Sequence, residues 1–116
     1  MKRILAPILL LTLLFPSLAY GVTIDDLVKR PQWTGLYYKK FSEVPFTGKT
    51  TGKSQGSLKN GKKVGSWVGY HENGQLSYKG TYKDGKRHGL WVRYFEDGTV
   101  WRSGTGRWRM GFPITE

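Results

Sequence analysis

The chain has 116 residues and no cysteine, and its 19 Lys and Arg against 8 Asp and Glu give a formal net charge of +11. The missing cysteine excludes disulfides, thiolate metal sites, a cysteine nucleophile and lipid attachment through cysteine. The excess of positive charge favours anionic partners: a lipid surface, an anionic envelope polymer or an acidic protein.

Residues 1–21 have the pattern of a secretory signal peptide. A basic pair at residues 2–3 precedes an apolar run over 4–15, and small residues then allow cleavage after Ala19 or after Gly21. The run is shorter than the roughly 18–20 apolar residues of a membrane span, so we expect cleavage rather than an anchor. Cleavage leaves 17 Lys and Arg against 8 Asp and Glu, a net charge of +9 over 95 residues. The mature protein is expected to be periplasmic or extracellular, which argues against a nucleic-acid partner.

The N-terminal segment, residues 22–34, differs in composition from the rest of the mature chain. Thr23 resembles an N-cap and is followed by two acids, which predicts one or two helical turns that end at Pro31. A first strand is expected over residues 36–41, and a second begins at residue 46.

Four Asx-Gly dipeptides divide the remaining sequence, spaced 13, 11 and 13 residues apart. They are Asn60-Gly61, Asn73-Gly74, Asp84-Gly85 and Asp97-Gly98. Asx-Gly between apolar runs is a strong hairpin signal, because both residues enter the left-handed region readily. Residues 56–79 align on 80–103 without gaps, with ten of 24 positions identical. The sequence therefore predicts tandem copies of a two-strand unit.

The predicted fold is all-β, a single-layer antiparallel meander of hairpin repeats of about 24 residues. Two full repeats occupy residues 56–79 and 80–103, and a degenerate first repeat precedes them at 35–55. Residues 104–116 form a truncated capping repeat, in which the glycine spacing continues at an offset of 26 rather than 24. No helix longer than two turns is expected between residues 35 and 111.

The stretch Tyr78-Lys-Gly-Thr-Tyr-Lys-Asp-Gly-Lys-Arg-His-Gly89 resembles the MORN repeat. It is most similar to the variant MORN repeats of bacterial proteins, some of which are labelled antitoxins of toxin–antitoxin systems. The resemblance implies the hairpin-repeat architecture. It also implies two possible roles, membrane association and an antitoxin or immunity function. Export argues against the second, since an antitoxin must meet its toxin in the cytoplasm.

The register of each hairpin decides which side chains share a face. A two-residue turn at the second and fourth Asx-Gly would place two arginines opposite one another in the second copy, so we favour a three-residue Glu-Asx-Gly loop. That register pairs Tyr70 with Leu76 and Val68 with Tyr78 and places these four residues on one face. Tryptophans alternate with cations on the other. This candidate aromatic-cationic face comprises Trp67, Lys79, Trp91, Arg93 and Trp101.

A second candidate site is a basic rim formed where two of the turns end. Its residues are Lys62, Lys63, Lys86 and Arg87. As a binding site, the rim would hold an anion. The alternative is that these are solvated turn residues and that lysines blunt the strand edges. The aromatic residues likewise have a packing alternative, in which they connect one repeat to the next.

Catalysis and metal binding find little support in the sequence. There is no nucleophile elbow, P-loop or His-Glu-x-x-His motif. His71 and His88 occupy non-equivalent repeat positions, which argues against a repeated metal site. We therefore expect no enzyme activity, no metal and no cofactor. The sequence predicts an exported, non-catalytic binding or scaffold module, with peripheral binding to anionic lipid headgroups or an antitoxin role as alternatives.

Overall fold

The computed structural model describes residues 21–30 and 35–115. The predicted signal peptide lies outside this part of the chain, apart from Gly21. Among the described residues, no helix is long and apolar enough to cross a bilayer.

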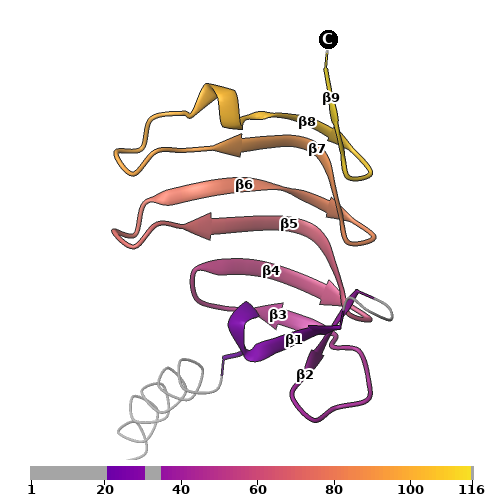
Figure 1. Cartoon of the computed structure of the whole chain (residues 1–116). Coiled ribbons are helices and arrows are strands. Elements are labelled where there is room, and N and C mark those ends of the chain that lie inside the picture. Colours follow the sequence, from indigo (N-terminus) through magenta and orange to yellow (C-terminus); the bar gives the residue numbers. More distant parts are fainter. Residues whose placement is uncertain (1–20, 31–34, 116) are drawn as a thin grey trace, which may run out of the picture.

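The described chain is almost entirely β-structure, as predicted (Figure 1). Its elements in order are η1 (Ile24–Asp26), β1 (Leu27–Arg30), β2 (Leu36–Lys39), β3 (Gly48–Thr50), β4 (Ser54–Lys59), β5 (Lys62–Tyr70), β6 (Leu76–Lys83), β7 (Lys86–Arg93), η2 (Arg102–Gly104), β8 (Gly106–Arg109) and β9 (Phe112–Ile114). Strands β3 to β9 form one antiparallel sheet in sequence order, so the meander prediction is confirmed. Strands β1 and β2 form a separate two-stranded sheet that the sequence did not indicate.

Two-residue turns join the strands at one side of the sheet. At Asn60–Gly61 and at Asp84–Gly85 the two φ values are +50° and +81°, which is the geometry of a type I′ hairpin. Met110–Gly111 repeats it with φ values of +46° and +91°, although methionine rarely occupies this conformation. The C-terminal unit therefore closes in the same way as the two full repeats.

Three-residue loops join the strands at the other side, as predicted. In the first, the His71 amide donates to the Gln75 carbonyl at 2.8 Å. The Asn73 carboxamide accepts from the Gln75 amide at 2.9 Å, which fixes the loop. The expected pairs of Tyr70 with Leu76 and of Tyr94 with Val100 are both present.

The predicted register fails one residue further along β6. Tyr78 pairs with Gly69 rather than Val68, and Lys79 pairs with Val68, because Ser77 is an extra residue in the strand. A bulge of this kind moves every later side chain to the opposite face. Tyr78 therefore joins the tryptophans, whereas Lys79 lies on the face of Val68.

Strands β5 and β7 bend sharply near their starts (Figure 1). Gly65 and Gly89 lie at the bends with φ values of +72° and +81°. A Cβ atom at either position would meet nothing within 4 Å. These two glycines therefore do not make room for neighbouring rings; they allow a backbone conformation that other residues rarely adopt.

Two tryptophans from equivalent repeat positions form the centre of the core. Trp67 is 0% exposed and Trp91 is 4% exposed. Their rings lie flat on Gly56 and Gly80, where an added Cβ would come within 2.2 and 2.1 Å of a ring atom. Tyr82 lies between the two indoles, with ring centroids 5.9 Å from Trp67 and 4.9 Å from Trp91 and edge-to-face geometry in both pairs. Such pairs stabilise by about 0.5–1.5 kcal/mol each beyond the area they bury.

The N-terminal segment caps the β3 end of the sheet. Its helical part is a single 3₁₀ turn, and the prediction that helix continues towards Pro31 is wrong because Leu27–Arg30 pairs as β1 with β2. The Val22 carbonyl accepts from the Thr51 amide at 2.8 Å, and the Gly61 carbonyl accepts from the Tyr37 amide at 2.9 Å. These bonds join the small sheet to the large one.

The glycine under each tryptophan gives a stability prediction. We expect Gly80→Ala to lower the free energy of unfolding by about 1–3 kcal/mol, because the new methyl group would overlap the Trp91 ring. Gly106, two repeats after Gly56 in β8, has nothing within 4 Å and serves as the matched control. Urea denaturation of both variants measures the difference. An equal effect of the two substitutions would show that ring contact is not the reason for glycine.

Candidate functional site

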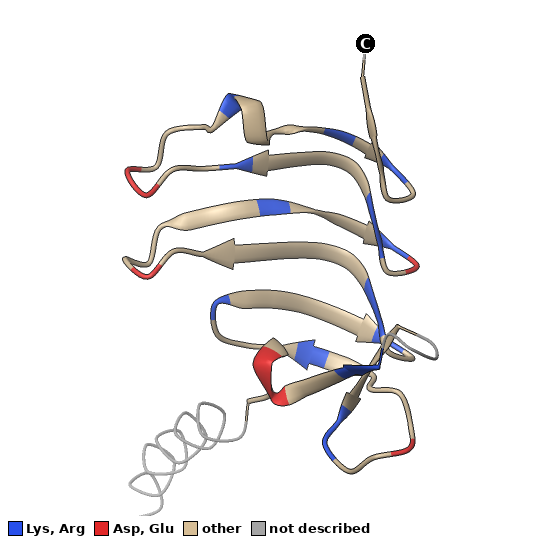
Figure 2. Cartoon of the chain, viewed as in Figure 1, with Lys and Arg blue, Asp and Glu red and all other residues tan. Residues whose placement is uncertain are grey.

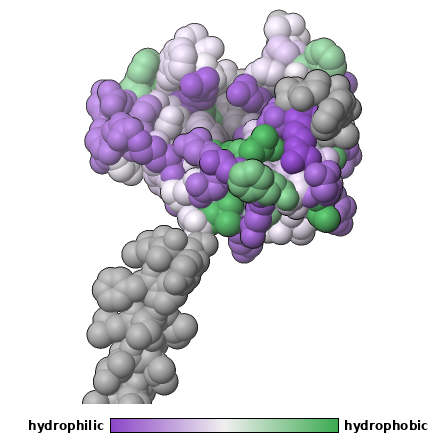
Figure 3. Space-filling model, turned by 60° about the horizontal axis from the view of Figure 1, so that its bottom comes forward, coloured by the Kyte–Doolittle hydropathy of each residue, from purple (hydrophilic) through white to green (hydrophobic). Residues whose placement is uncertain are grey.

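The bends in β5 and β7 enclose a trough that runs across the strands. Two adjoining cavities of about 320 and 240 Å³ share Lys63 and Tyr82 and form its length. The principal side chains that line the trough are those of Lys29, Tyr37, Lys63, Tyr78, Tyr82, Arg87, Trp91, Arg93 and Trp108. A space-filling view shows hydrophilic residues on either side of a central hollow (Figure 3).

A five-residue pattern in each repeat builds the walls of the trough. It reads Lys63-x-Gly65-x-Trp67 in one repeat and Arg87-x-Gly89-x-Trp91 in the next. Since the strand bends at the central glycine, the cation returns over the ring that follows it. The Lys63 ammonium lies 4.8 Å from the Trp67 centroid, and the Arg87 guanidinium carbon lies 5.1 Å from that of Trp91. Each of these cation–π contacts stabilises by about 0.5–1 kcal/mol or more where water is excluded.

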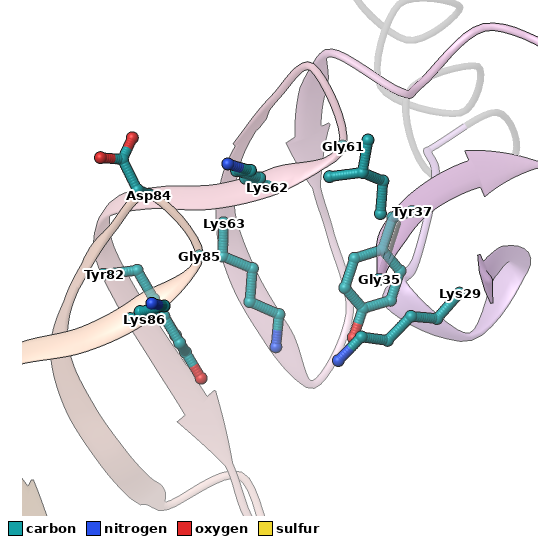
Figure 4. Close-up of a pocket in the computed structure, with 11 residues that line it drawn as sticks. Lys29, Gly35, Tyr37, Gly61, Lys62, Lys63, Tyr82, Asp84, Gly85 and Lys86 are labelled. Carbon is teal, nitrogen blue, oxygen red and sulfur yellow. The ribbon is translucent and has the colours of Figure 1, made fainter. Parts of the chain in front are cut away.

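Cations from separate elements converge on the trough without acidic partners. Figure 4 shows the ammonium groups of Lys29 and Lys63 pointing into the same cavity as the hydroxyls of Tyr37 and Tyr82. The carboxylate of Asp84 points away from them. In the described part of the chain, the only ion pair joins the exposed side chains of Lys53 and Glu72, and Glu72 lies in a three-residue loop at the other side of the sheet.

Burial and like charges both act on Lys63. Desolvation lowers the pKa of the Lys63 ammonium, and the positive charges of Lys29 and Arg87 lower it further. Burial raises the pKa of the Tyr37 and Tyr82 hydroxyls, although a hydrogen bond from Arg87 opposes this at Tyr82. Both hydroxyls therefore remain protonated and able to donate at neutral pH.

Charge differs between the two sides of the large sheet (Figure 2). Glu72, Glu96 and Asp97 lie in the three-residue loops, whereas a cluster of Lys and Arg, together with Asp84, lies at the two-residue turns and the bends beside them. These cations make the electrostatic potential positive on the side of the two-residue turns. A concave surface there focuses that potential on a ligand.

The four predicted rim residues separate into two pairs. Lys63 and Arg87 point into the trough and are partly buried. Lys62 and Lys86 are exposed at its edge. The Lys62 side chain packs beside Gly85, and the Lys86 side chain packs beside Gly111 in the following turn. A Cβ atom added to either glycine would lie 3.6 Å from the Cβ atom of that lysine.

The five residues of the predicted aromatic-cationic face do not act together. Trp67 and Trp91 are buried in the core, and Lys79 belongs to the opposite face because of the bulge at Ser77. Arg93 reaches the trough, and its guanidinium carbon is 4.8 Å from the ring centroid of Trp101, which is 36% exposed.

The sites predicted from the sequence lack five residues of the trough: Lys29, Tyr37, Tyr78, Tyr82 and Trp108. Tyr78 was expected on the other face, with Val68. Lys29 and Tyr37 come from the small sheet, whose position no repeat pattern predicts. Trp108 occupies the last unit, where the Arg87 guanidinium carbon lies 4.8 Å from its ring centroid. The offset alignment of residues 106–111 on 80–85 equates Trp108 with Tyr82, and this is the signal that could have found it.

The trough supplies hydrogen-bond donors and positive charge. Among the described residues, no group of His, Cys, Asp and Glu could hold a metal ion. His71 and His88 each contact backbone, at the Tyr94 carbonyl (2.9 Å) and the Met110 amide (3.3 Å). The arrangement can bind an anion.

Tryptophans of the core and of the surface should differ in their effect on stability. We expect Trp67→Ala to lower the free energy of unfolding by about 3–5 kcal/mol, since it empties a fully buried site. Trp101→Ala, the matched exposed tryptophan, should lower it by about 1 kcal/mol or less. Urea denaturation followed by circular dichroism measures both. Comparable losses would contradict the division between core and surface tryptophans.

Comparison with known proteins agrees with the repeat geometry. The sequence profile of the MORN repeat variant matches residues 63–84 and 87–105. No curated protein and no solved structure matches the chain. Each matched segment contains a bend, at Gly65 or Gly89, and the three-residue loop that follows it. The middle of the chain is therefore similar to MORN repeats of the variant type.

Proposed function

We propose that this protein is an exported, non-catalytic binding module that captures an anionic ligand in its trough. The observation that carries the proposal is the group of cations, Lys29, Lys63, Arg87 and Arg93, that line one concavity without an acidic partner among the described residues. MORN repeats favour a binding or scaffold role in general. The charge of the trough indicates the kind of ligand.

Unpaired cations in a partly buried site lower the stability of the free protein. Removing an ammonium group from water costs free energy, and neighbouring positive charges add to that cost. The lowered pKa of Lys63 reflects both effects. A bound anion would reverse them, so the arrangement favours the complex over the free protein. Perturbed groups of this kind in a concavity are typical of binding sites.

Export and the rigid aromatic floor fit this role. The signal-peptide pattern of residues 1–21 would deliver the protein to the envelope or beyond, where anionic polymers and lipids are available. Trp67, Trp91 and Tyr82 hold the cations above them in place, which reduces the entropy lost on binding.

Two alternative functions rest on other features of the chain. Peripheral binding to anionic lipid would use the exposed edge, where Lys62 and Lys86 could each contribute on the order of 1 kcal/mol against a charged bilayer. An antitoxin role is supported only by the naming of some variant MORN proteins, and export argues against it.

Binding to a sulfated polymer tests the proposal. We expect the purified protein to bind dextran sulfate and not neutral dextran, and the double variant Lys63→Gln, Arg87→Gln to bind at least tenfold more weakly. The double variant Lys49→Gln, Lys79→Gln removes the same charge from the opposite face and should bind nearly as the wild type does. Isothermal titration calorimetry gives the affinities.

Equal losses in the two double variants would show that diffuse charge, and not the trough, binds the polymer. A loss confined to Lys62→Gln, Lys86→Gln, together with sedimentation on anionic vesicles, would favour the membrane alternative.

The pH dependence of binding provides a second test. An anion binds the protonated form of Lys63, whose pKa in the free protein is lowered. Affinity for dextran sulfate should therefore fall as pH rises through that pKa, at lower pH than an ordinary lysine would allow. Lys63→Arg should remove this fall, since arginine stays charged. Lys29, Arg87, Tyr37 and Tyr82 face Lys63 and are unchanged in both proteins, so an identical pH profile in the variant would contradict the role of Lys63.

A further inference from the structure

We infer that the ligand of the trough is a linear chain of phosphate groups that occupies two successive subsites. The inference rests on the proposed function and names the chemistry of its ligand. Subsite one is formed by Lys29, Tyr37, Lys63 and Tyr82, and subsite two by Arg87, Arg93, Tyr78 and Trp108.

Subsite one presents donors that converge. Lys29 and Lys63 have three N–H donors each and no acceptor. Their ammonium groups point into the same cavity as two tyrosine hydroxyls (Figure 4). Both ammonium groups lie near the ring of Tyr37, which belongs to the small sheet. The distances to its ring centroid are 5.6 Å for Lys29 and 5.8 Å for Lys63. A group with several acceptor oxygens and negative charge fits this set.

Subsite two repeats the chemistry one repeat further along the sheet. Arg87 occupies the repeat position of Lys63, on the second strand beyond it, so the two backbones are roughly 9.5 Å apart. Arg87 lies over the rings of Trp91 and Trp108, which orient the guanidinium. Its planar donors suit the paired oxygens of a phosphate. The two cavities share Lys63 and Tyr82, so the two subsites adjoin.

The shortage of acceptors argues against a polypeptide ligand. A peptide that runs along the trough crosses the strands of the described sheet, so its amide groups cannot pair with them. Those amides would need acceptors from side chains. The indole N–H groups of the floor are donors and are already bonded, to the carbonyls of Ser57 and Thr81. The Asp84 carboxylate points away. A chain of phosphate groups has acceptors and no amide donors, so it leaves nothing unsatisfied.

The shape of the site favours a slender chain over a bilayer. Lys63 and Arg87 precede the bends of β5 and β7, line the trough and are partly buried there. Headgroups on a flat surface would meet the exposed edge at Lys62 and Lys86 first. A free polymer can lie along the trough and contact both subsites at once, which strengthens binding through effective concentration.

Inorganic polyphosphate of different lengths tests the inference. At equal total phosphate, we expect a long chain to bind the purified protein at least tenfold more tightly than tripolyphosphate, and more tightly than poly-L-glutamate of similar charge. Quenching of tryptophan fluorescence, checked by calorimetry, reports binding. Lys29→Gln changes only subsite one and Arg93→Gln only subsite two. Each should weaken long-chain binding several-fold and reduce the dependence on length, whereas Lys79→Gln on the opposite face should do neither.

The outcomes separate the inference from the proposed function. If tripolyphosphate and long chains bind equally well, the two-subsite arrangement is overturned, while anion capture in the trough stands. If poly-L-glutamate binds as tightly as polyphosphate, the preference for phosphate is overturned and the proposed function again stands. If neither these polymers nor dextran sulfate binds, the proposed function itself fails.

Discussion

The contact on which the rest of the structure depends is that of a tryptophan ring with a glycine on the neighbouring strand. Trp67 on Gly56 and Trp91 on Gly80 are the same contact one repeat apart, and in both the ring lies where any Cβ would be. A thin sheet has no second layer to bury its apolar face, so each repeat folds its tryptophan flat onto the preceding strand. Because the indole N–H groups donate to strand carbonyls, at 3.1 Å for Trp67, the rings are fixed in orientation as well as in depth.

The same contact explains the position of the trough. A ring of this size is covered from above only if its own strand turns back over it, which the bends at Gly65 and Gly89 achieve. The residue carried over each ring is a cation, Lys63 or Arg87. An aliphatic side chain at either position would close the core. A long cation covers the ring with its stem and exposes its charge, so one repeat position contributes to the packing and to the binding surface.

The repeat, the turns and the meander could be predicted because they are local or periodic in the sequence. Asx-Gly fixes each hairpin, and the 24-residue period fixes the order of the strands. The assignment of faces failed at Ser77, since one extra residue reverses all later side chains and no composition signal marks it. Gly65 and Gly80 look alike in the sequence, although one bends the strand and the other accommodates a ring. Lys29 and Tyr37 could not be placed at all, because the small sheet docks through tertiary contacts outside the repeat.

Stability and binding make opposite demands on Lys63. Its contacts with Trp67 and Tyr82 favour the charged form, whereas burial and the charges of Lys29 and Arg87 lower its pKa. A neutral residue would relieve that opposition in the free protein. It would also remove the Lys63 ammonium group, a hydrogen-bond donor that lines both cavities of the trough. The aromatic rings resolve the conflict in part, because they hold the cation in one place without neutralising it as a carboxylate would. The charge of the trough is thus not cancelled within the described chain, and its cations are held in position before any ligand arrives.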